Sequence, residues 1–204
     1  MTTLNRVAER RSESPGYSLI EITVVVALLL TLYGIATPRL LTALDEGRVT
    51  GAARYMAARL YDARVEAIKR SANVSLRFEL TPDGYRYTTY LDTNRNGVRT
   101  HDIQLGIDRR IRAPEGLAYH FTGVEFGTLP DLPAVEPGGP PPGTDPIRIG
   151  GSDILTFTPV GTSSPGSLYI RGANQAQYVV RVVGETGRVR ILRFDKRTKQ
   201  WKPL

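Results

Sequence analysis

The longest apolar run of the chain extends from Leu19 to Thr37, and Glu21 is its one charged residue. About 20 apolar residues, at 1.5 Å rise each in a helix, cross the ~30 Å hydrocarbon core of a bilayer. A carboxylate within such a span costs at least ~2 kcal/mol unless a partner neutralises it. The run predicts a transmembrane helix over 17–38 in which Glu21 has a role in assembly. The alternative is an ordinary anchor with an incidental glutamate at its edge.

After Pro38 the chain changes from continuous apolar to amphipathic. Over 39–72, apolar side chains recur mostly at three- and four-residue steps with arginines between them, which is typical of a helix with one buried face. The helix is therefore expected to continue past Pro38, with its second half packed on a domain. The apolar positions are Leu41, Leu44, Ala52, Tyr55, Met56, Leu60 and Ile68.

From residue 73 onward the pattern has a period of two, which indicates half-buried strands. Two strands are expected around the Thr81–Gly84 turn, and the others are expected at 117–126, 154–159, 167–171, 177–183 and 188–194. Residues 128–151 are rich in proline and glycine and predict a long, exposed, flexible loop. The fold class is α+β: a long N-terminal helix packed on an antiparallel β-sandwich head over 73–204.

Residues 1–16 form a short basic segment, and Gly16-Tyr17-Ser18-Leu19-Ile20-Glu21 follows it directly. This string resembles the processing site of type IV prepilins and type II secretion pseudopilins. The resemblance implies that a prepilin peptidase removes 1–16 as a leader by cutting between Gly16 and Tyr17, and then N-methylates Tyr17. Glu21 is the fifth residue from the new terminus, and Pro38 matches the helix-bending proline of that family.

Cleavage would free an amine on Tyr17, and that amine needs a counter-charge in lipid. We expect Glu21 to pair with this amine in its own subunit or in the one below, which would set the axial stagger of a filament. The basic leader indicates a cytoplasmic start, so the chain is expected to be a single-pass bacterial inner-membrane protein with its head in the periplasm.

The segment Asp92-Thr93-Asn94-Arg95-Asn96-Gly97 matches the opening of a calcium loop, with oxygen side chains at alternate positions and glycine at the sixth. The twelfth position should carry a carboxylate, but it is Ile103, and Asp102 comes one place early. No helix is expected before this loop. A hairpin loop stabilised by Asn, Asp and Gly is the competing interpretation, and calcium is the single cofactor that the sequence suggests.

The C-terminal third resembles the GspH/FimT family of minor pilins and pseudopilins. The resemblance rests on Phe157-Thr-Pro-Val-Gly161, on the strands 166–170 and 178–183, on Gly187-Arg-Val-Arg-Ile191, and on Asp92-x-Asn94-x-Asn96-Gly97. It implies a β-sandwich head on the long helix. In some members the Gly-Arg-x-Arg strand is associated with DNA capture, so Arg188, Arg190 and Arg193 are candidate nucleic-acid-binding residues, with Trp201 available for base stacking.

Charge and composition allow but do not require a polyanionic partner. The formal charge is +7, and the basic C-terminal strand can equally be a solvated edge whose charges deter strand pairing. The chain has no cysteine, its two histidines lack zinc spacing, and it contains no nucleophile elbow, phosphate loop or dinucleotide fingerprint. These absences argue against an enzyme.

The sequence therefore predicts a minor pilin-like structural subunit of a type II secretion pseudopilus or a type IV pilus. Its expected partners are other pilins or pseudopilins, the prepilin peptidase and the inner-membrane assembly platform. The alternatives are a DNA-binding minor pilin that serves natural transformation and an unrelated membrane-anchored binding domain.

Overall fold

The computed structural model describes residues 16–204, and the predicted leader 1–16 lies almost entirely outside this range. The chain divides into two compact units, up to Leu40 and from Leu41 onward. One helix, α1 (Leu19–Arg70), supplies nearly all of the described part of the first unit and the beginning of the second. The helix continues through Pro38, as predicted, and ends at Arg70, two residues before the predicted end at residue 72.

In the first unit the apolar side chains of α1 are exposed. In the second unit one face of the same helix is buried, because small and apolar side chains recur there at three- and four-residue steps. Leu41, Leu44 and Ile68 lie off this face and are at least 48% exposed, although the sequence pattern placed them on the buried face. The buried residues of α1 are Asp45, Val49, Ala52, Ala53, Met56, Leu60, Ala63 and Ala67.

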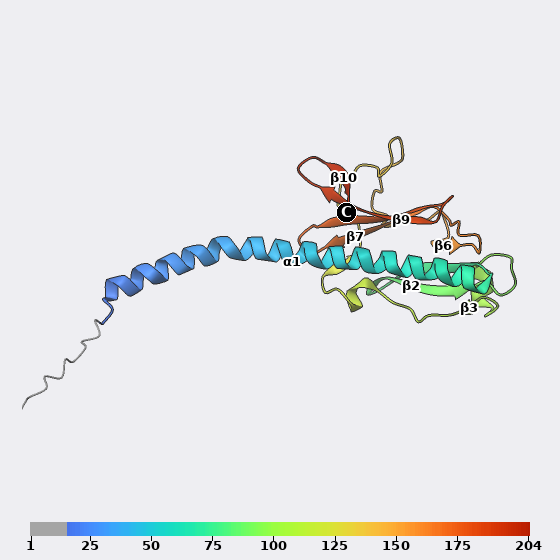
Figure 1. Ribbon diagram of the computed structural model, residues 1–204, viewed down its shortest axis with the longest axis horizontal. Helices are drawn as coiled ribbons and strands as arrows, with labels where there is room; N and C mark the ends of the chain where they lie inside the picture. Colours follow the sequence, from blue (N-terminus) through green and yellow to red (C-terminus); the bar gives the residue numbers. More distant parts are fainter. Residues whose placement is uncertain (1–15) are drawn as a thin grey trace, which may run out of the picture. The chain divides into compact units, whose positions relative to one another are not determined.

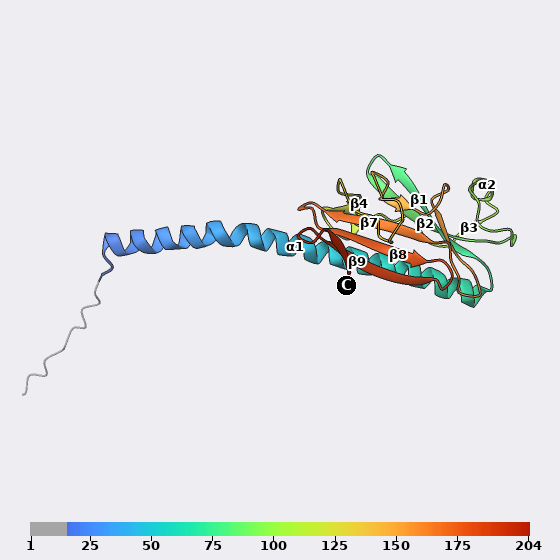
Figure 2. The ribbon, with the colours of Figure 1, turned by 90° about the horizontal axis from the view of Figure 1, so that it is seen from above.

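The head contains two antiparallel sheets (Figures 1 and 2). The small sheet has the order β3-β2-β1-β6, and the large sheet has the order β10-β9-β8-β7-β4, with β5 also pairing with β7. The strands are β1 (Val74–Thr81), β2 (Gly84–Leu91), β3 (Arg109–Arg110), β4 (Val124–Phe126), β5 (Ile147–Arg148), β6 (Ile154–Phe157), β7 (Gly166–Gly172), β8 (Gln177–Val183), β9 (Arg188–Asp195) and β10 (Gln200–Pro203). Two short helices, α2 (Thr100–Gln104) and η1 (Leu117–Tyr119), lie in the connections.

The main core forms where the buried face of α1 meets the inward faces of both sheets. Met56 and Leu60 from the helix share this core with Leu76 of β1 and Leu168 of β7, and all four side chains are fully buried. The predicted α+β class, with a long helix on antiparallel sheets, is confirmed.

Two local predictions are wrong. The segment 117–126 is a 3₁₀ turn followed by three strand residues, because the carbonyl of Leu117 accepts hydrogen bonds from the N–H groups of His120 and Phe121 instead of a neighbouring strand. The segment 128–151 is not simply an exposed loop. Leu132 is 4% exposed in a second core cluster with Tyr169 and Val179 on the outer face of the large sheet.

Candidate functional site

The N-terminal part of the described chain carries the predicted processing and assembly residues, and all of them are exposed. Gly16 and Tyr17 precede α1, Tyr17 is 79% exposed, and Glu21 lies in the first turn of the helix. Within residues 16–204, α1 is the one helix whose length and composition suit a membrane span, and no residue of its qualifying window is buried. A fully exposed apolar window needs a nonaqueous environment or partner helices, as expected for an anchor.

Asp45 joins α1 to the turn between β7 and β8. Its carboxylate accepts hydrogen bonds from the backbone N–H of Asn174 at 3.0 Å and of Ala176 at 3.4 Å, and the residue is 4% exposed. Gly172 lies directly against this carboxylate, where a Cβ atom would overlap it. The periodicity of the buried helix face includes position 45, so the pattern could have indicated that this aspartate is buried.

A second polar cluster fixes the segment after β3 to the helix. Glu115 accepts hydrogen bonds from the hydroxyls of Tyr55 on α1, at 2.8 Å, and Tyr87 on β2, at 2.9 Å. His120 contacts the Tyr55 hydroxyl at 3.1 Å, and the Arg59 guanidinium lies over the Tyr55 ring.

These neighbours set the protonation of the cluster. Burial raises the pKa of Glu115, but hydrogen bonds from Tyr55 and Tyr87 and the positive charges of Arg59 and His120 lower it, with a net result below the ordinary value of 4.5. Burial also raises the pKa of Tyr87. Glu115 is therefore held as a carboxylate that links three segments, a role that no local sequence motif marks.

The predicted calcium loop connects β2 to α2. Asp92 accepts hydrogen bonds from the N–H groups of Arg95 at 2.7 Å and Gly97 at 2.8 Å, and from the side-chain amide of Asn73 at 2.8 Å. Arg95 and Gly97 have positive φ angles of 63° and 88°, which lets the chain turn around the Asp92 carboxylate. Asn94 and Asn96 point their amide nitrogens toward Asp102 in α2.

Asp108, immediately before β3, lies close to the same loop. Burial raises its pKa, and the charges of Asp92 and Asp102 raise it further, while the N–H of Arg99 counteracts them by donating a hydrogen bond. Asp102 is the carboxylate that comes one place before the expected twelfth position, whereas no sequence motif marks Asp108, the next acidic residue after Asp102.

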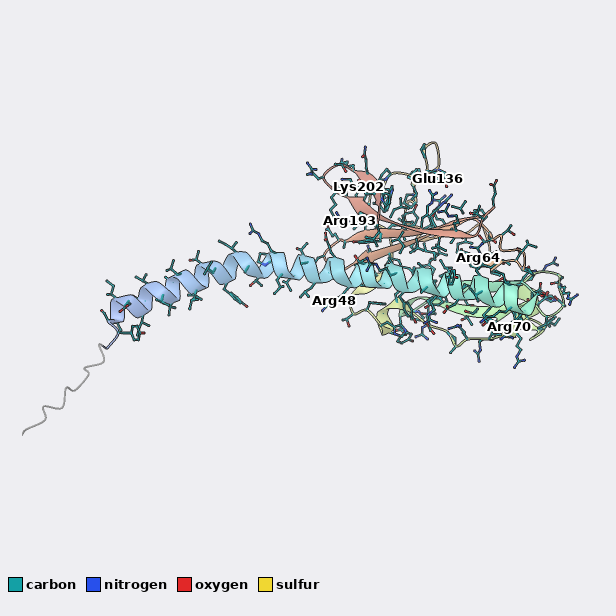
Figure 3. The ribbon with its side chains drawn as sticks, in the orientation of Figure 1. Arg48, Arg64, Arg70, Glu136, Arg193 and Lys202 are labelled. Carbon is teal, nitrogen blue, oxygen red and sulfur yellow. The ribbon has the colours of Figure 1, made fainter. Side chains whose placement is uncertain are left out.

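The candidate nucleic-acid-binding residues do not share one face of β9. Arg188 and Arg190 are exposed, and Arg190 pairs across the strands with Arg181. Val189 and Ile191 pack on the main core, as predicted, and Arg193 follows their alternation and contacts Glu46 of α1 at 3.6 Å (Figure 3). Trp201 is not available for base stacking, because it packs on Phe194 and Tyr169 and donates a hydrogen bond to the Pro133 carbonyl.

These features define the class of protein: one N-terminal apolar helix whose amphipathic continuation forms the core of an antiparallel β head, which is the pseudopilin architecture. Comparison with protein families finds that the family described as type II transport protein GspH matches residues 52–187. The chain belongs to this GspH family.

Among solved structures, the chain is similar to the minor pseudopilin EpsH from the type 2 secretion system of Vibrio cholerae. The identity is 19%, the match covers 72% of this chain and 97% of that chain, and the TM-score is 0.44. No curated protein matches the sequence.

Proposed function

We propose that this chain is processed at Gly16 and co-assembles through α1 with other pseudopilins as a minor, structural and non-enzymatic subunit of a secretion pseudopilus. The observation that carries the proposal is the difference in side-chain burial between the two halves of α1. Its first half exposes apolar side chains along a span long enough for a bilayer, and its second half is the core of the head. The same helix thus supplies residues both for anchoring and for the core of the head.

The resemblance of Gly16–Glu21 to a prepilin processing site supports cleavage after Gly16. Removal of the leader exposes the Tyr17 amine at the start of the apolar helix, where Glu21 is the nearest described carboxylate along the chain. We infer that the amine is methylated and that it pairs with Glu21 of its own or a neighbouring subunit. The partners are then the prepilin peptidase, the assembly platform and other pseudopilins, with the leader cytoplasmic and the head periplasmic.

Intact-mass and N-terminal analysis of the full-length protein from its native membrane tests this proposal. The expected product starts at a methylated Tyr17, and Gly16→Leu should block cleavage. A Cβ atom at Gly16 meets nothing within 4 Å, so steric disruption of the fold cannot explain such a block. Gly34→Ala, at a helical glycine that is also free within 4 Å, is the matched control. A wild-type protein that retains Met1 would refute the proposal.

A second candidate function is DNA binding, favoured by the two exposed arginines of β9. Within residues 16–204, neither Arg188 nor Arg190 forms an ion pair, so both guanidinium groups can meet a phosphate. A groove of about 540 Å³ beside β9 and β10 adds Arg54 of α1 to Arg190. Arg193 and Trp201 are engaged elsewhere, which leaves this candidate with fewer contacts than the sequence suggested.

A further inference from the structure

Two turns of the large sheet lie together at one end of the head. The turn 173–176 connects β7 to β8, and the turn 196–199 connects β9 to β10. Because β8 and β9 are adjacent and antiparallel, the start of β8 and the end of β9 lie at the same end of the sheet. The Lys196 ammonium group donates a 3.3 Å hydrogen bond to the side-chain carbonyl of Gln175, so the two turns are directly linked.

The first of these turns is held against the start of the helical part of the head. The side-chain amide of Asn174 donates a 3.4 Å hydrogen bond to the Leu41 carbonyl, and the Asn174 backbone N–H donates one to Asp45. Leu41 follows Thr37, the last residue of the apolar run, by four positions, which is about 6 Å along a helix. This end of the head is therefore joined to the proposed anchor by the shortest length of chain.

A pocket of about 310 Å³, which we call the turn pocket, lies between α1, the β7–β8 turn and the end of β9. It is lined by Thr42, Asp45, Glu46 and residues 174–178 and 193–197. Its volume is at the lower end of the range for pockets that bind small molecules.

The acidic side chains of the turn pocket already have partners. Asp45 accepts hydrogen bonds from two backbone N–H groups. Glu46 pairs with Arg193 at 3.6 Å. Asp195 pairs with Lys202. The negative charges of the pocket are thus compensated within the head.

The basic side chains of the turn 196–199 are not compensated in this way. Lys196, Arg197 and Lys199 are exposed, and within residues 16–204 none of them forms an ion pair. The turn has a defined shape, because Asp195 accepts a 2.9 Å hydrogen bond from the Arg197 backbone N–H and Lys199 adopts a positive φ of 51°. Three positive charges are therefore held together at the edge of the turn pocket.

We propose that the turn pocket and the turn 196–199 bind the phosphate group of an anionic phospholipid at the bilayer surface. Lys196 and Arg197, which line the pocket, supply the charged N–H donors that phosphate oxygens accept. A bilayer is favoured over another polyanion because these cations lie at the end of the head that is closest along the chain to the apolar run. This binding rests on the proposed function, since α1 must first anchor the chain. The contact holds the head at the membrane surface while the subunit is anchored there.

A fluorescent label on the turn tests this contact in the full-length protein. The chain has no cysteine, so Thr198→Cys creates a single labelling position in the turn 196–199. Thr186→Cys, in the turn between β8 and β9, is the matched control, because both threonines are exposed. The eight residues of β9 separate the two positions by about 26 Å.

The protein is reconstituted in phosphatidylcholine vesicles with or without phosphatidylglycerol, and lipids with a nitroxide on the headgroup quench the label. Phosphatidylglycerol should increase quenching at position 198 at least about twofold, and about 1 M salt, with a Debye length of ~3 Å, should reverse the increase. Quenching at position 186 should not change. Quenching at position 198 that ignores lipid charge would overturn the proposal. A change that follows the protein-to-lipid ratio instead would indicate a neighbouring subunit, and would also overturn it.

A pair of double variants separates this site from a general effect of charge. Each lysine or arginine near an anionic surface strengthens binding by about fivefold, so Lys196→Gln/Arg197→Gln should reduce the phosphatidylglycerol-dependent quenching at least about fivefold. Arg188→Gln/Arg190→Gln removes two charges from the first half of β9 and should leave this quenching unchanged. Equal reductions in both variants would overturn the site.

Flotation with neutral vesicles measures the anchor independently of the turn. Flotation without quenching at position 198 in anionic vesicles would overturn the lipid contact and leave the proposed anchor intact. A protein that does not float with the vesicles would refute both.

Discussion

Asp45 and Asn174 are separated by 129 positions in the chain, yet the Asp45 carboxylate accepts a 3.0 Å hydrogen bond from the Asn174 backbone N–H. This contact attaches the helix to the turn between β7 and β8 inside the head. The carboxylate is buried and also accepts a hydrogen bond from the Ala176 N–H, so it satisfies two backbone donors of this turn.

Asp45→Ala should therefore destabilise the head more than a nearby surface change does. Removing the carboxylate leaves two backbone donors unsatisfied, at about 1–3 kcal/mol each, and should lower the Tm by several degrees. Glu46→Ala is the matched control, because the Glu46–Arg193 pair is roughly half exposed and contributes about 0–1 kcal/mol. Thermal unfolding of the full-length protein in detergent measures both. Equal losses would contradict the role of Asp45.

Glu115→Gln should reduce the loss of stability in acid. The pKa of Glu115 is lowered in the folded protein, so its charge contributes stability that is present above the unfolded value near 4.5 and is lost as pH falls through the folded value. The Tm of the wild type should exceed that of the variant at pH 7, and the difference should shrink below about pH 4.5. Glu185→Gln, at an exposed glutamate, should show no such convergence. A pH-independent difference would exclude this linkage.

Glu21→Ala should impair co-assembly with partner pseudopilins while leaving the head folded. If Glu21 neutralises the Tyr17 amine in lipid, its loss costs at least ~2 kcal/mol, which corresponds to a decrease of more than about tenfold in association. Co-purification of partner subunits from native membranes measures assembly, and Glu185→Ala is the control for a lost surface carboxylate. Wild-type recovery of partners by the Glu21 variant would remove its proposed role.

The DNA-binding candidate predicts a difference between the two faces of β9. Gel-shift affinity of the full-length protein should fall at least tenfold in Arg188→Ala/Arg190→Ala and should weaken steeply with salt. Arg193→Ala removes the same charge on the side of the strand that contacts Glu46, so it should change affinity little. An equal effect of all three arginines would indicate a nonspecific charge effect, and absent or salt-insensitive binding would exclude this function.

The spacing of apolar residues along the sequence was enough to predict the helix and the strands that have a single regular periodicity. The apolar run and its amphipathic continuation predicted α1, and alternation predicted the strands 177–183 and 188–194 within one residue. It did not predict the last strand, β10. Gln200–Pro203 becomes a strand because it pairs with Leu192–Asp195, and that pairing depends on a partner rather than on its own pattern.

The segment 128–151 also makes contacts that its local sequence did not predict. Its proline and glycine content correctly excludes a long helix or central strand. Local composition cannot reveal that Leu132 enters a cluster with Tyr169 and Val179, or that Glu136 pairs with Arg181.

The sequence by itself determined the apolar helix, the order of most strands and the family motifs, because these depend on the spacing of side chains along the chain. The tertiary structure decided which polar groups act together. Asp108 joins Asp92 and Asp102, Glu115 joins Tyr55 and Tyr87, and Arg193 separates from Arg188 and Arg190. These groupings arise from contacts between distant segments and from the two faces of a strand, and both are fixed only when the core packs.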